Sequence, residues 1–163
     1  MRTFSREQTV KWLAGLEKRA SSAGVFCETG DGKLLIVKAN YKKHWSIPGG
    51  IIDHNETPKQ AAIRETKEEV GIILDPEQVR FIAVVDRVSK EVGHTYQFIF
   101  HAIVTEKDLT DIALQENEIE SWALVSPEEV RSEPQEGHLL GKAIFHWANN
   151  RSGYFEQTFR HDN

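Results

Sequence analysis

The sequence predicts an α/β or α+β domain built around a mixed β-sheet. Short β-rich runs alternate with amphipathic helical segments along the chain; some neighbouring runs are joined by a tight turn and others are separated by a helix. Hairpins give antiparallel strand pairs and helical crossovers give parallel ones, so both pairings are expected in one sheet. The length of 163 residues suits a single domain with its own core.

Six segments have the residue composition of strands. Gly30-Asp31-Gly32 separates the first two segments, which predicts a β-hairpin. The third segment contains Gly49 and Gly50, which permit a backbone path that other residues disfavour. The six segments are residues 23–29, 33–38, 45–52, 79–88, 94–104 and 121–125.

Local start and stop signals delimit the helices. Thr57 is a suitable N-cap, a proline follows it at the first helical position, and Gly71 suits the C-terminal stop, so a helix is predicted over residues 58–70. A further helix is predicted to start at Ser126, and a final amphipathic helix lies near residues 140–148.

A first helix is predicted over residues 6–20, because Ser5-Arg6-Glu7-Gln8 has the spacing of a capping box. Its apolar stripe needs cover from the chain's own sheet or from a second subunit, so the chain is expected to be a monomer or a homodimer. The short connection to the first strand favours the chain's own sheet. Residues 1–163 are therefore interpreted as one domain with this extra helix. The stripe consists of Thr9, Trp12, Leu13, Leu16 and Ala20.

Composition argues against several classes of protein. The net charge of −5 predicts no general attraction to nucleic acid or to an anionic membrane. Cys27 is the single cysteine, so an intrachain disulfide is excluded and a structural zinc site is not expected. The N-terminus is too polar for a signal peptide and no apolar run reaches membrane-spanning length, so a cytoplasmic protein is expected.

Three carboxylates are expected on one face of the helix over residues 58–70. Glu65, Glu68 and Glu69 have the spacing i, i+3 and i+4, which places them within a single turn. Like charges at this spacing oppose helix formation unless a cation relieves them. Hard oxygen ligands that converge on one point suit Mg²⁺.

The sequence around these carboxylates resembles the Nudix box. Residues 50–72 read GIIDHNETPKQAAIRETKEEVGI and place Gly50, Glu56, Arg64-Glu65, Glu68-Glu69 and Gly71 at the spacing of that motif. The resemblance extends over about residues 22–148. It implies a Nudix-like α/β/α sandwich and a pyrophosphohydrolase that acts on acid anhydrides. Three positions depart from the family pattern, namely Asp53, Asn55 and Thr66.

The resemblance also implies a metal site. Glu68 and Glu69 would be the primary ligands of Mg²⁺, with Mn²⁺ as a substitute, and the Gly49 carbonyl would be another ligand. Glu65 would be either a further ligand or the base that orients water. Divalent ions neutralise phosphates and lower the pKa of an attacking water molecule.

The general base has more than one candidate. Glu65 is the first, and the resemblance allows a carboxylate on a downstream loop, for which Glu116 and Glu118 are the candidates. Arg64 is expected to pair with Glu56 or Glu65 and to orient it. No catalytic role is expected for the two box glycines, which shape the turn and end the helix.

The substrate is expected to be a small nucleotide-type molecule. Trp45 and His44, just before the box, are weak candidates for contact with it, although a core position for Trp45 and a solvated one for His44 are favoured. The absence of ADP-ribose and coenzyme A signatures favours nucleoside triphosphates, including oxidised or non-standard ones. The alternatives are ADP-ribose, nucleotide sugars, dinucleoside polyphosphates, and a non-catalytic domain that senses a nucleotide.

Overall fold

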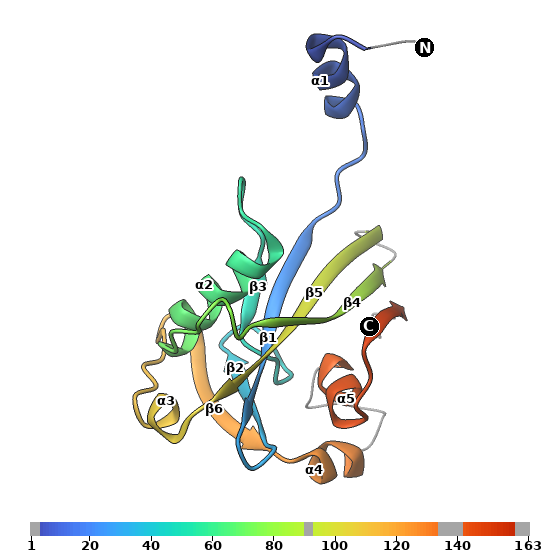
Figure 1. Cartoon of the computed structure of the whole chain (residues 1–163). Helices are drawn as coiled ribbons and strands as arrows, with labels where there is room; N and C mark the ends of the chain where they lie inside the picture. Colours follow the sequence, from blue (N-terminus) through green and yellow to red (C-terminus); the bar gives the residue numbers. More distant parts are fainter. Residues whose placement is uncertain (1–3, 90–92, 134–141, 159–163) are drawn as a thin grey trace.

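The computed structural model describes residues 4–89, 93–133 and 142–158, and in this part of the chain seven strands form one sheet (Figure 1). The strands are β1 (Ser21–Thr29), β2 (Leu34–Ala39), β3 (Gly49–Ile51), β4 (Arg80–Ser89), β5 (Gly93–Val104), β6 (Ile119–Val125) and β7 (Gly153–Thr158). Their order is β6-β2-β1-β5-β4-β7, and β3 pairs with β1 outside this path. The pairs β1–β5 and β4–β7 are parallel and the others are antiparallel, which confirms the predicted mixed sheet.

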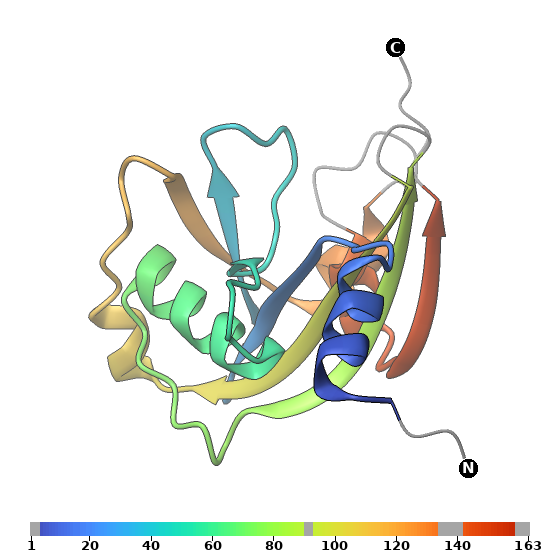
Figure 2. The same ribbon diagram turned by 90° about the horizontal axis from the view of Figure 1, so that it is seen from above.

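Helices lie on both faces of the sheet (Figures 1 and 2). The helices are α1 (Arg6–Ala14), α2 (Pro58–Val70), α3 (Glu106–Thr110), α4 (Pro127–Ser132) and α5 (Lys142–Ala148). One apolar cluster lies between α2 and the sheet and includes Ala61 and Val70. A second cluster lies on the opposite face under α4 and α5 and includes Val130 and Ile144. The expected α/β/α layering is confirmed.

The bounds of α2 agree with the prediction because both ends carry local signals. The Thr57 hydroxyl accepts a hydrogen bond from the Gln60 N–H at 3.3 Å, and the Gln60 side chain accepts one from the Thr57 N–H at 2.9 Å. Gly71 adopts a left-handed φ of 77° that ends the helix. The unusual Thr66 is fully buried, and its hydroxyl donates to the Ala62 carbonyl at 2.8 Å.

Two elements were not predicted. α3 begins at Thr105, whose side chain accepts a hydrogen bond from the backbone N–H of Asp108. β7 adds a parallel strand beyond β4 at the edge of the sheet. Of the predicted final helix, Lys142–Ala148 is observed, and the part before residue 142 lies outside the described residues.

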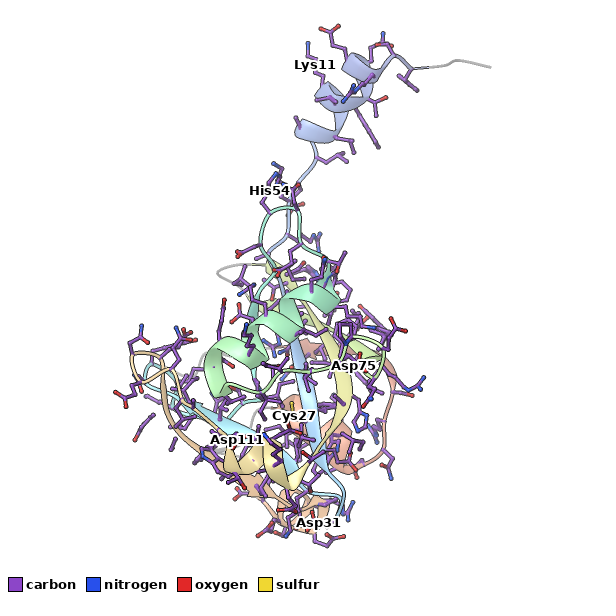
Figure 3. All side chains as sticks on the ribbon, turned by 60° about the vertical axis from the view of Figure 1, so that its left-hand side comes forward. Lys11, Cys27, Asp31, His54, Asp75 and Asp111 are labelled. Carbon is purple, nitrogen blue, oxygen red and sulfur yellow. The ribbon has the colours of Figure 1, made fainter. Side chains whose placement is uncertain are left out.

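The N-terminal helix differs from the prediction in length and in packing. α1 ends at Ala14 rather than at residue 20, and it buries no residue in the described chain. Trp12 is 62% exposed and Leu13 is 50% exposed, so the expectation that the stripe packs on the sheet is wrong. Residues 15–20 precede β1 and continue its path past the end of the strand, so that α1 lies away from both faces of the sheet (Figures 1 and 3).

The single cysteine is part of the core. Cys27 is fully buried in the first apolar cluster (Figure 3), and burial raises the pKa of its thiol to about 12. A thiol in such surroundings is protonated and unreactive at neutral pH. Among the described residues, no helix is both long enough and apolar enough to span a membrane.

Deletion of residues 1–15 should leave the melting temperature within about 2 °C of that of the intact chain, because α1 contributes no buried surface to the domain. Calorimetry on the two proteins, combined with light scattering, tests this expectation. A larger fall in melting temperature, or a dimer that becomes a monomer on deletion, would show that the helix is covered in solution.

Candidate active site

Two glycines bring the β3 segment unusually close to its neighbours. Gly49 has a φ of 152°, and a Cβ there would lie 2.3 Å from the Ala23 carbonyl oxygen. A Cβ on Gly50 would lie 2.5 Å from the carboxylate of Glu65. No side chain fits at either position without displacement of its neighbour, so the glycines set the distance between β3 and α2.

Glu69 is a buried carboxylate held by this segment. Its side chain reaches back from the last turn of α2 and accepts a hydrogen bond from the Gly49 N–H at 2.8 Å. Glu69 is only 3% exposed, and burial raises its pKa to about 7. The Gly49 N–H and the charge of Lys42 oppose this rise, whereas the charges of Glu65 and Glu118 add to it.

Arg64 joins three carboxylates. Its Nε and one terminal nitrogen donate to the two oxygens of Glu56, each at 2.9 Å. Its other terminal nitrogen, Nη1, donates to Glu65 at 2.8 Å and to Glu68 at 2.9 Å. A fifth bond at 3.1 Å reaches the Ile51 carbonyl. The guanidinium therefore fastens the end of β3 and the following turn to α2.

The two carboxylates that share the Arg64 nitrogen lie in different surroundings. The Glu65 side chain is 15% exposed, and burial raises the pKa of its carboxyl despite the opposing effect of Arg64. The Glu68 side chain is 50% exposed. By contrast, the hydrogen bonds from Arg64 lower the pKa of Glu56. Glu56 is thus held as a carboxylate, as suits a partner that keeps Arg64 in place.

Of the two acids proposed on the downstream loop, Glu118 lies nearer the carboxylates of α2. Its charge contributes to the raised pKa values of Glu65 and Glu69, and its carboxylate accepts a hydrogen bond of 3.4 Å from the Tyr41 hydroxyl. Glu116 is fixed through its backbone carbonyl, which accepts from the Asn40 side chain at 3.3 Å. The structure gives no contact that brings the Glu116 carboxylate to the cluster.

The lead-in to β3 lies on the other side of Gly49. Trp45 is partly buried against the second apolar cluster, in agreement with the favoured core position. His44 is exposed, but it also lines a cavity of about 90 Å³. The residues around this cavity include Lys42, His44, Ser46, Gly49, Arg87 and Gln97, together with apolar residues of α5.

Arg87 and Gln97 were not predicted as site residues, and neither was Tyr41. Gln97 lies between Tyr96 and Phe98 in β5, and Arg87 follows Asp86, which ends the apolar run of β4 at residues 81–85. A polar residue that interrupts an apolar run was the available signal. The sequence alone does not reveal that both side chains line one cavity, because this depends on the register in which β4 and β5 pair.

The donor set suits a hard divalent cation, although the described residues present no preformed site. The carboxylates of Glu65, Glu68 and Glu69 and the peptide oxygens near Gly49 are all oxygen donors of the kind that Mg²⁺ prefers. Among the described residues, no three acidic, histidine or cysteine side chains converge as metal ligands do. Arg64 instead holds Glu65 and Glu68, so metal binding by both requires them to turn away from its Nη1.

Comparisons with known proteins agree with this geometry. Over 61 residues the chain is 43% identical to an RNA pyrophosphohydrolase of Hydrogenovibrio crunogenus, a match that covers 37% of this chain and 36% of that protein. Over 55 residues it is 42% identical to an 8-oxo-dGTP diphosphatase of Proteus vulgaris, covering 31% of this chain and 48% of that protein. The chain thus matches less than half the length of either relative.

The fold is shared with solved structures. A MutT NUDIX hydrolase from Burkholderia pseudomallei superposes with a TM-score of 0.64 and 22% identity, covering 82% of this chain and 98% of that one. A family model described as the NUDIX domain matches residues 18–148. Because this match includes most of the chain and every carboxylate of the α2 cluster, the chain belongs to the NUDIX domain family.

Proposed function

We propose that the chain is a pyrophosphohydrolase that cleaves a diphosphate linkage in a small nucleotide-type substrate with the help of Mg²⁺, for which Mn²⁺ can substitute. The observation that carries this proposal is the set of Glu65, Glu68 and Glu69 on one turn of α2, facing the close-packed Gly49–Gly50 segment. A diphosphate carries several negative charges that resist attack by water. Acidic side chains alone would repel it, so the proposal requires a cation between them.

Glu68 and Glu69 would hold the divalent cation with the Gly49 carbonyl, and Glu65 is a further candidate ligand. When bound, such a cation neutralises the phosphates, holds the leaving group and activates water. Glu69 is fixed by the Gly49 N–H, whereas Glu68 is half-exposed and bound to Arg64 Nη1 through one of its oxygens. The two proposed ligands therefore stand next to each other on the same turn, one buried and one half-exposed.

Either Glu65 or Glu118 would act as the base that orients and deprotonates the attacking water. Burial raises the pKa of the Glu65 carboxyl, the direction that makes a carboxylate a better proton acceptor. Arg64, held by Glu56, is a positioning residue that sets where the Glu65 carboxylate lies. Glu116 stays a weaker candidate because only its backbone is fixed near the cluster.

For the substrate we favour nucleoside triphosphates, including oxidised ones. The two relatives differ in their named substrates, RNA in one case and 8-oxo-dGTP in the other, yet one is named a pyrophosphohydrolase and the other a diphosphatase. ADP-ribose, nucleotide sugars and dinucleoside polyphosphates are the alternative substrates. A panel of these compounds, assayed for released phosphate, pyrophosphate or nucleoside monophosphate, distinguishes among them, and calorimetric titration with the same compounds detects binding without turnover.

Replacement of a proposed metal ligand should abolish turnover. We expect Glu68→Gln and Glu69→Gln each to lower kcat by about a hundredfold or more, on the order of 3 kcal/mol in the barrier, while the proteins stay folded. Glu77→Gln, at an exposed turn away from the cluster, is the matched control and should retain full activity. Retained Mg²⁺-dependent turnover in both cluster variants would contradict the metal assignment.

The buried position of Glu69 predicts a pH-dependent stability of the metal-free protein. Its carboxyl has a pKa of about 7 when folded and an ordinary one, near 4.5, when unfolded. Between these values the folded state binds the extra proton, so the stabilisation is complete below pH 4.5 and is lost as the pH rises through 7. This difference between the folded and unfolded pKa values corresponds to a loss of up to about 3 kcal/mol in the free energy of unfolding.

Melting curves in chelator test this linkage. Glu69→Gln should melt several degrees above the wild type at about pH 8 and show little advantage near pH 5, because the amide carries no charge to bury. Glu68→Gln, which alters an exposed carboxylate of the same turn, should show a smaller dependence. An equal difference between wild type and Glu69→Gln at both pH values would refute a raised pKa for Glu69.

Kinetics of three variants should locate the base. If Glu65 serves, Glu65→Gln should lower kcat by about a hundredfold with little change in KM, because the lost interaction is made mainly in the transition state. Glu118→Gln and Glu116→Gln should then have minor effects. A normal kcat in Glu65→Gln, with a crippled Glu118→Gln, would move the base to the downstream loop.

A further inference from the structure

A polar recess lies on the α5 face of the sheet, across Gly49 from the carboxylates. Side chains alternate along β5, so Phe98 packs in the first apolar cluster under α2 while Ile99 belongs to the second cluster under α5. Gln97 points to the same face as Ile99 and lines the cavity of about 90 Å³ together with Arg87 of β4. The cavity exceeds the space of a single water molecule.

The amide of Gln97 has an unmet hydrogen-bonding demand. Gln97 is 9% exposed, and among the described residues its Oε1 has no hydrogen-bond partner. A buried acceptor without a donor is unfavourable, and most such atoms in folded proteins are satisfied. The terminal torsion of a glutamine is soft, so the oxygen can turn into the cavity at little cost. A ligand that presents an N–H or O–H group at this wall would satisfy it.

The rest of the polar wall supplies donors. Lys42, His44 and Arg87 line the cavity, and lysine and arginine side chains offer hydrogen-bond donors and no acceptors. Burial lowers the pKa of Arg87 to about 10, which still leaves the guanidinium protonated at neutral pH. A ligand therefore meets the unsatisfied Gln97 Oε1 acceptor beside the cationic donors of Lys42 and Arg87, which favour oxygen atoms.

The recess adjoins the proposed catalytic centre at Gly49. Gly49 lines the cavity, and its N–H binds Glu69 at 2.8 Å. Lys42 lines the cavity, and its charge acts to lower the pKa of both Glu69 and His44, so its ammonium group influences the carboxylate cluster as well as the cavity. A substrate whose diphosphate lies at Glu69 can thus pass its phosphate chain along Lys42 and place its other end in the recess.

We propose that this recess is the base subsite of the enzyme and that Gln97 selects nucleobases in which a ring N–H stands beside a carbonyl oxygen. Guanine, hypoxanthine and uracil carry this edge: the N–H donates to Gln97 Oε1 and the carbonyl oxygen accepts from Arg87. Adenine and cytosine carry an amino group in place of the carbonyl and an unprotonated ring nitrogen in place of the N–H. The amino group of adenine or cytosine would therefore face Arg87, a donor against a donor. The unprotonated ring nitrogen would face Gln97 Oε1, an acceptor against an acceptor. The inference rests on the proposed function because it names the substrate of the same site.

Inosine and adenosine triphosphates provide a matched pair of probes, since the two purines differ only at this edge. The wild type should favour ITP over ATP, and GTP over ATP, by about tenfold or more in kcat/KM, mainly through KM. Calorimetry with IMP and AMP in chelator gives a second measurement that needs no turnover, and IMP should bind more tightly. Equal kcat/KM for ITP and ATP, together with equal affinities for IMP and AMP, would overturn the inference.

Gln97→Met removes the amide at similar side-chain length. The ITP-to-ATP preference should fall to within about threefold, while the melting temperature stays the same or rises because an unsatisfied buried atom has been removed. Gln78→Met, at an exposed turn, is the control and should keep the preference. An unchanged preference in Gln97→Met, or an equal loss with both nucleotides, would refute the selective role.

The outcomes also separate this inference from the proposed function. Metal-dependent hydrolysis that treats ITP and ATP alike would leave the function standing and refute the base subsite. Selective binding of IMP that depends on Gln97, without turnover of any diphosphate, would support the subsite and refute the hydrolase.

Discussion

The arrangement of the acidic site depends on Arg64. Glu65, Glu68 and Glu69 lie within one turn of α2 and repel one another. The guanidinium of Arg64 offsets part of this repulsion by donating to Glu65 and Glu68, and it also binds Glu56, which precedes the helix. The bidentate pair with Glu56 is the firmer part, because both of its oxygens are bound. The bonds to Glu65 and Glu68 share one nitrogen. In the proposed enzyme, a cation can therefore take over Glu65 and Glu68 while Glu56 keeps Arg64 in place.

The same site depends on Gly49 and Gly50, which have no side chains. A Cβ on Gly49 or Gly50 would collide with the β1 backbone or with Glu65, so β3 could not approach both β1 and α2. This approach places the Gly49 N–H at the buried Glu69 and brings the lead-in segment to the opposite face. The carboxylates of α2 and the proposed base subsite therefore lie on different faces of the sheet, and Gly49 contacts both.

Local signals explain what could be predicted from the sequence. The bounds of α2 were predicted because its caps lie within a few residues of its ends, and the carboxylate cluster follows from helical spacing alone. The resemblance to the Nudix box supplied the link between Arg64 and Glu56, which helical spacing alone does not reveal. The failures are non-local. No local sequence signal near β7 predicts its parallel pairing with β4. The apolar stripe of α1 likewise does not specify which surface would cover it.

Two features of the site oppose stability of the free protein. A carboxylate at the position of Glu69 is nearly inaccessible to water, and Gln97 carries a buried acceptor without a donor among the described residues. Natural sequences tolerate such conflicts mainly where function requires them. Both conflicts flank Gly49, and both would be relieved by the same kind of ligand: a cation with bound phosphates at Glu69 and a ring N–H at Gln97. A substrate that contacts both Glu69, through its cation and phosphates, and Gln97, through its base, gains binding energy at both positions. A fragment of that substrate gains it at only one of them. The structure thus favours substrates in which base and diphosphate belong to one molecule over inorganic pyrophosphate or a free nucleoside.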